Sequence, residues 1–147
     1  MSELLVMSML AGRRCALRAG DVGSVIEAGT IAPVPRAPVH VIGITALRSQ
    51  AMTVIDCRVA IGKEPSQFPC DSHLAIVEVE GHSYALRFDQ IDDIGNAQSD
   101  LAPVPGGSGD DWNRVSHGMI ETDRGPALLL NVAQLIAGTQ ENLEVAA

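Results

Sequence analysis

Short apolar runs separated by turn residues recur along the chain, and this pattern predicts a β-rich fold. Glycine, proline and aspartate interrupt the runs at close intervals, as in barrels and sandwiches rather than in alternating strand–helix units. Valine and isoleucine are abundant, and β-branched residues favour a pleated sheet. The predicted strands are Leu4–Leu10, Cys15–Arg18, Val22–Ile26, Ile31–Val34, Val39–Leu47, Met52–Ile55, Leu74–Val79, Tyr84–Phe88, Ile91–Ile94, Val115–Ile120 and Ala127–Leu130.

Two short helices are predicted from capping signals. Asp56 can cap a helix over Cys57–Ile61, and Asn131 can cap one over Val132–Ala137, each with a glycine at its end. We expect a fraying helical tail over Thr139–Ala147. Proline-rich and glycine-rich loops are expected over 63–72 and 105–111.

The second half of the chain repeats the order of features in the first. Four pairs of segments match in register: Ala16-Leu17-Arg18 with Ala85-Leu86-Arg87, Ala32-Pro33-Val34-Pro35 with Ala102-Pro103-Val104-Pro105, Gly43 with Gly118, and Asp56 with Asn131. We expect two small packed barrels, each too small to bury much alone, with a groove between them. The predicted barrels cover about 12–66 and 74–131 within one domain over 1–147, with a strand at 3–11 and a helix at 132–143 packing across.

Composition excludes several classes of function. The net charge is −8, with 18 acidic and 10 scattered basic residues, so neither nucleic acid nor an acidic membrane surface is an expected partner. Glu3 precedes the first apolar run and Arg13-Arg14 follow it, the reverse of a signal peptide. No apolar stretch is long enough to insert into a membrane. The odd number of cysteines favours a reducing cytoplasm.

No motif indicates a cofactor, a metal or catalysis. His40, His73, His82 and His117 lack metal-ligand spacing. The sequence contains no nucleophile motif and no phosphate-binding glycine loop followed by lysine. We therefore expect a binding module without cofactor, metal or enzymatic activity.

The segment Val39–Gly62 resembles the CheW-like domain of chemotaxis coupling proteins. That family typically has Gly, two hydrophobic residues and Asn-Leu-Arg-Gly, then Pro, two hydrophobic residues and Asp-Leu-Arg. The matching positions here are Gly43, Leu47, Arg48, Val54, Ile55, Asp56 and Arg58. Prolines around Pro33 and Pro38 and the segment Phe88–Ile91 are also similar to family motifs, and the resemblance extends from about Leu4 to Ile136.

The resemblance implies a mainly β fold of two packed five-stranded SH3-like barrels with short helices. It implies a cytoplasmic adaptor that joins the helical tip of a methyl-accepting chemoreceptor, held between the barrels, to the regulatory domain of the histidine kinase CheA, held at a barrel end. The candidate partner-binding residues are Arg48, Val22, Ser24, Gly43 and Ser49, and Asp56 and Asn131 are candidate structural caps. Gly43 is also interpreted as a site of close backbone packing or a bulge.

The chain departs from the family pattern at three positions. Serine stands at Ser24 where the family usually has glutamate, Ser49 replaces the glycine after the arginine, and Thr53 replaces a proline. These departures are compatible with a coupling protein dedicated to particular partners. They are also compatible with a competitor that damps or redirects signalling. A third alternative is a small β-barrel enzyme that uses acidic residues such as Asp89, Asp92 or Asp93.

Overall fold

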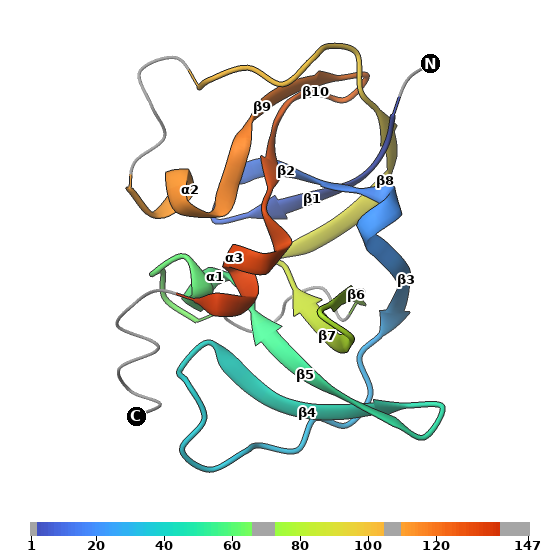
Figure 1. Ribbon diagram of the computed structural model, residues 1–147, viewed down its shortest axis with the longest axis vertical. Coiled ribbons are helices and arrows are strands. Elements are labelled where there is room, and N and C mark those ends of the chain that lie inside the picture. Colours follow the sequence, from blue (N-terminus) through green and yellow to red (C-terminus); the bar gives the residue numbers. More distant parts are fainter. Residues whose placement is uncertain (1–2, 66–72, 105–109, 139–147) are drawn as a thin grey trace.

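The computed structural model describes residues 3–65, 73–104 and 110–138, and their strands form two five-stranded sheets (Figure 1). Sheet A has the strand order β8 (Gln90–Asn96), β1 (Leu4–Leu10), β2 (Arg13–Arg18), β10 (Gly125–Leu130), β9 (Ser116–Thr122). Sheet B has the order β3 (Val22–Glu27), β6 (His73–Val79), β7 (His82–Arg87), β5 (Gln50–Asp56), β4 (Val41–Leu47). The prediction of a mainly β fold with two five-stranded, SH3-like units is confirmed, although the described strands of neither sheet close into a full barrel. We call the two units subdomains A and B.

Four short helices accompany the sheets: the 3₁₀ helix η1 (Ala19–Asp21), α1 (Cys57–Ala60), α2 (Asp110–Val115) and α3 (Val132–Ala137). Both predicted caps are confirmed. The Asp56 side chain accepts a hydrogen bond from the Arg58 N–H at 3.1 Å, and Asn131 Oδ1 accepts one from the Gln134 N–H at 3.3 Å. The predicted extension of the last helix to residue 143 and the helical tail lie beyond the described residues, which end with Gly138 as the C-cap of α3.

Two local predictions are wrong. Ile31–Val34 is not a strand, because only Ala32 forms an isolated bridge, with Ile44. Pro33 follows Ala32 and has no N–H to extend the ladder. Val115 ends α2 rather than beginning a strand, and α2 was missed because a glycine-rich segment precedes it. The loops predicted over 63–72 and 105–111 fall largely outside the described residues, and residues 110–111, predicted as loop, belong to α2 instead.

The strand order corrects the predicted division of the chain into barrels over 12–66 and 74–131. Hairpin β1–β2 joins β8, β9 and β10, whereas hairpin β6–β7 joins β3, β4 and β5. The two sheets are related by the repeat, since β1–β5 correspond in order to β6–β10 and both sheets then have the same strand order. Each half of the sequence therefore contributes its first hairpin to the subdomain completed by the other half.

The hairpins β1–β2 and β6–β7 are buried on both of their faces, which explains why each lies between the two subdomains. Leu5, Met7 and Ala16 pack inside subdomain A, whereas alternate residues of the same strands lie between the subdomains. Val54, Leu74 and Ala85 form the corresponding inner cluster of subdomain B. The interface core between them includes Val6, Leu10, Cys15, Leu17, Ile55, Ala75, Val77, Leu86, Phe88, Leu128 and Leu130, together with Trp112 and Leu135 from the helices. The two subdomains therefore share one hydrophobic core.

A close backbone approach recurs once in each subdomain. Ala32 and Ile44 exchange two backbone hydrogen bonds, of 2.9 and 2.8 Å, and Ala102 and Met119 do the same at 2.9 and 2.7 Å. A Cβ at Gly43 would lie 2.2 Å from the Ala32 carbonyl oxygen, and a Cβ at Gly118 would lie 2.6 Å from that of Ala102. Glycine is required at both positions because any side chain would collide with backbone.

Three hairpin turns have two residues with positive φ, the conformation that matches the twist of paired strands. The φ angles are 51° and 80° at Ala11-Gly12, 53° and 82° at Glu80-Gly81, and 53° and 69° at Arg48-Ser49. The first two turns have glycine at the second position, whereas the β4–β5 turn has Ser49. The Ser49 backbone is therefore strained, because a Cβ is disfavoured in this conformation.

Replacing Ser49 with glycine is expected to stabilise the protein by about 0.5–1 kcal/mol, since the strain disappears while the turn is retained. Urea denaturation measures the change. Ser24→Gly is the matched control, because exposed Ser24 lies within β3 at ordinary φ and glycine weakens a strand. Equal losses of stability in both variants would contradict a strained turn.

A buried histidine joins subdomain B to the C-terminal helix. His40 is 2% exposed, and its Nε2–H donates to the Ile136 carbonyl oxygen at 2.7 Å. Its Nδ1 is buried and has no hydrogen-bond partner among the described residues. Burial lowers the pKa of His40 below its ordinary value, the Ile136 hydrogen bond opposes this shift, and the charge of Arg114 adds to it. His40 is therefore neutral in the folded protein near pH 7.

The free energy of unfolding is expected to decrease as the pH falls below about 6.5, because the unfolded chain then binds a proton at His40 that the folded chain excludes. Above that pH, where His40 is neutral in both the folded and the unfolded chain, this loss of stability is absent. Thermal unfolding at a series of pH values measures it. His40→Gln should have a flatter profile between neutral and mildly acidic pH, whereas His117→Gln, at an exposed position, should retain the wild-type profile. Parallel profiles for wild type and His40→Gln would show that protonation of His40 does not cause the loss of stability at acidic pH.

Candidate partner-binding groove

The two edge strands β3 and β8 lie on the side of the subdomain junction opposite the helices α1–α3 (Figure 1). They are equivalent strands of the repeat, and each contains a register irregularity against its neighbour. In β3 the shift lies between Val22 and Ser24, and in the β1–β8 pair it lies between Val6 and Ser8. A bulge twists an edge strand and redirects its side chains, which also discourages the addition of another strand.

A groove of about 520 Å³ runs between these strands. It is lined by Val6, Val25, His73, Ile91, Asp92, Asp93, Ile94 and Arg124. Val25 is 41% exposed and Ile94 is 49% exposed, so one large aliphatic side chain from each subdomain is accessible to solvent. A concave surface with exposed aliphatic residues from two packed units is typical of a binding site.

Charged residues border the apolar part of the groove on the β8 side. Asp92 and Asp93 are exposed, and Arg124 Nη2 lies 3.8 Å from Asp93 Oδ2. The equivalent bulge residues on β3 are Gly23 and Ser24, which carry no charge. Subdomain B thus contributes Val25 and His73 to the lining, whereas Asp92, Asp93 and Arg124 all come from subdomain A.

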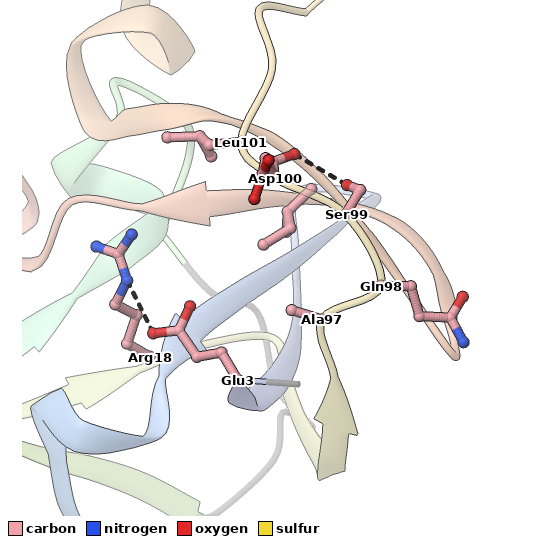
Figure 2. Close-up of a pocket in the computed structure, with 8 residues that line it drawn as sticks. Glu3, Arg18, Ala97, Gln98, Ser99, Asp100 and Leu101 are labelled. Atoms are coloured by element: carbon pink, nitrogen blue, oxygen red, sulfur yellow. Dashed lines mark hydrogen bonds and ion pairs between the residues drawn. The ribbon is translucent and has the colours of Figure 1, made fainter. Parts of the chain in front are cut away.

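A second hollow, of about 630 Å³, lies at one end of subdomain A (Figure 2). Its lining comes mainly from the segment 97–101, together with Glu3, Arg18 and Ile120. Arg18 Nε and Glu3 Oε2 form an ion pair of 3.1 Å there, and Ser99 Oγ donates to the Asp100 carbonyl oxygen at 2.9 Å. Because this hollow involves subdomain A alone and is mostly polar, it is the weaker candidate for a shared binding surface.

The predicted partner-binding residues occupy two separate parts of subdomain B. Val22 and Ser24 lie on β3, beside the groove, with Val22 partly buried against the interface core and Ser24 exposed. Arg48 and Ser49 form the exposed β4–β5 turn, and β4 and β3 are the outermost strands of sheet B. Arg48 forms no ion pair or hydrogen bond within the described ranges.

Gly43 has a different role from the other candidates. It is buried beneath Ala32, in the close approach described above. Its backbone supports the position of β4 and offers no side chain or surface to a partner.

Asp89, Asp92 and Asp93, the carboxylates considered for an enzyme, lie in different surroundings. Asp89 Oδ2 accepts hydrogen bonds of 2.8 Å from both the Ala11 N–H and Arg58 Nη1, which links the two subdomains. Asp92 and Asp93 are exposed on the groove wall. Within the described ranges, no three His, Cys, Asp or Glu side chains are grouped to hold a metal ion.

The two described cysteines are buried in the interface core. Burial raises the pKa of Cys15 to about 12, and it raises the pKa of Cys57 well above its ordinary value. Both thiols therefore remain protonated, whereas nucleophilic attack and metal binding require a thiolate.

Val25 and Ile94 were not predicted as site residues. Each belongs to a predicted apolar strand, and the apolar pattern does not distinguish a solvent-facing position of such a strand from a core position. The repeat offered one signal for them. Val25 and Ile94 occupy equivalent positions of the two halves, and equivalent exposed residues are expected to lie together where the halves meet. Both lie on edge strands next to a register shift, and the pattern of residues encodes neither feature.

Comparison with known proteins gives the family. A model of the CheW-like domain matches residues 4–140, nearly the whole chain. The chain belongs to the CheW-like domain family. The crystal structure of the scaffolding protein TtCheW from Thermoanaerobacter tengcongensis is similar, with a TM-score of 0.78 and 25% sequence identity over 88% of this chain and 89% of that chain. No curated protein matches the chain.

The family match and the similarity to TtCheW indicate a chemotaxis scaffold or adaptor rather than an enzyme. Among the described residues, no helix is long and apolar enough to cross a membrane.

Proposed function

We propose that this protein is a cytoplasmic adaptor that couples the helical tip of a methyl-accepting chemoreceptor to the regulatory domain of a CheA-type histidine kinase. The observation that carries the proposal is the groove between β3 and β8, with exposed Val25 and Ile94 in a CheW-like fold. TtCheW, described as a scaffolding protein, has the same fold and supports a role in assembly.

The groove suits a helix better than an added strand. An amphipathic helix binds by placing spaced apolar side chains against a hydrophobic surface, and Val25 and Ile94 supply such a surface from both walls. The bulges of β3 and β8 disrupt the regular ladder that an added strand needs. A receptor tip, which is helical, is therefore the partner that we assign to the groove.

The β4–β5 turn is the second contact in this proposal. Arg48 is exposed at an end of subdomain B, and its guanidinium is free to make directional hydrogen bonds to a carboxylate or to backbone oxygens. We assign this turn to the kinase regulatory domain. Receptor and kinase then bind different parts of one rigid scaffold.

Val25→Glu is expected to weaken receptor binding by about tenfold or more, because it buries an unpaired charge in the apolar groove. Co-sedimentation with a receptor cytoplasmic fragment and CheA, followed by a kinase assay, measures the effect. Val39→Glu is the matched control, since Val39 is 50% exposed and lies outside the groove lining. No co-sedimentation of wild type and no change in kinase activity would refute the proposal.

Arg48→Glu is expected to weaken kinase binding about tenfold while leaving the melting temperature nearly unchanged. Glutamate fits this backbone, because Glu80 already has a φ of 53° at the equivalent position of the β6–β7 turn. Titration of the variant with the kinase regulatory domain measures binding, and thermal unfolding measures stability, so the two effects are separated. Loss of binding accompanied by unfolding would show that Arg48 is structural.

The departures at Ser24 and Ser49 favour a second candidate function, a competitor that occupies receptor or kinase without coupling them. Both residues are exposed, so they alter recognition surfaces and leave the core unchanged. Addition to a working receptor–kinase array distinguishes the two functions. A competitor lowers kinase output, whereas a coupler restores it to an array that lacks its own coupling protein.

A further inference from the structure

The groove walls are related by the repeat. Val25 and Ile94 are equivalent, and so are Val22 and Ile91, and both pairs hold the same register against their neighbouring strands. Val25 pairs with Ala75 of β6, just as Ile94 pairs with the equivalent Val6 of β1. One exposed aliphatic side chain from each wall, Val25 and Ile94, is therefore available to an apolar helix face in either direction of the helix.

Charge breaks this symmetry. Asp92 and Asp93 line the groove on β8, whereas the equivalent residues of β3, which lie beside the groove, are the uncharged Gly23 and Ser24. The Asp93 side chain is 88% exposed, and its ion pair with Arg124, itself 46% exposed, is long at 3.8 Å. Exposed pairs of this kind are weak, so the Asp93 carboxylate remains available to a partner cation.

We propose that the β8 wall makes the groove selective for an amphipathic helix that has lysine or arginine on one flank and a neutral opposite flank. The basic flank lies against Asp92 and Asp93, and the neutral flank lies against Gly23 and Ser24. This inference rests on the proposed function and specifies the chemistry of the partner in the same groove. The net charge of −8 also favours encounter with a basic partner.

The asymmetry also fixes the direction of the bound helix. Reversing the helix keeps its apolar face in the groove but moves its basic flank to the β3 wall, away from the two carboxylates. The proposal therefore includes one preferred direction, set by residues that contribute little to the apolar contact.

Two synthetic helices test the selectivity. Both carry leucine at positions i, i+3, i+4 and i+7; one has lysine along one flank and the other has glutamate there. Fluorescence anisotropy is expected to show that the wild-type protein binds the lysine helix about three- to tenfold more tightly at low salt. The preference should shrink at about 0.3 M salt, where exposed charges are screened.

The variant Asp92→Asn/Asp93→Asn should lose the preference and retain the fold, since both side chains are exposed. Asp100→Asn is the matched control, at an exposed aspartate outside the groove, and should retain the preference. A nitroxide label at one end of the lysine helix should broaden resonances at one end of the groove only. Equal broadening at both ends would overturn the fixed direction.

Two outcomes separate the failure of this inference from that of the proposed function. Equal affinity of wild type for both helices, with Val25→Glu abolishing both, would overturn the charge selectivity and leave groove docking intact. Binding that is insensitive to Val25→Glu, or no binding of either helix, would overturn the selectivity and count against the groove as the receptor site. A preference that persists in the double variant would also overturn the inference.

Discussion

Burial of the hairpins β1–β2 and β6–β7 on both faces is the constraint on which the rest of the structure depends. One face of each hairpin fills its own subdomain and the other forms the interface core. The subdomains are therefore fixed relative to each other by hydrophobic packing, with Asp89 adding a polar link from Arg58 to Ala11. A groove at their junction keeps its shape because both walls belong to strands bonded to these hairpins.

Much of the fold was predictable from local patterns. The apolar runs indicated most strands, Asp56 and Asn131 indicated two helix starts, and the repeat indicated two similar units. The assignment of hairpins to subdomains was not predictable, because equivalent halves offer equivalent partners to each hairpin. Local patterns also missed α2, in which Trp112 joins the interface core and Arg114 donates hydrogen bonds of 3.0 and 2.8 Å to the carbonyl oxygens of Gln134 and Gly138.

The candidate site was predicted less completely than the fold. Family resemblance directed attention to Arg48, Ser24 and Val22. Arg48 lies in the β4–β5 turn, and Val22 and Ser24 lie on β3 beside the groove. The opposite wall, with Ile94 and Asp93, was missed as a binding surface because a bulge decides which side chains face solvent. Ser24 stands where the family usually has glutamate. At the equivalent positions of the second half, Asp92 and Asp93 supply two carboxylates, so the acidic side of the groove is on β8 and not on β3.

The exchange of hairpins between halves has a consequence for biosynthesis. When β1 and β2 leave the ribosome, the strands β8 and β10 that flank them do not yet exist, and the first hairpin cannot bury either face. Neither subdomain can be completed from the first half of the sequence alone. The nascent chain must keep aliphatic strands soluble until the second half of the domain has been synthesised, so this topology delays assembly and exposes the protein to aggregation.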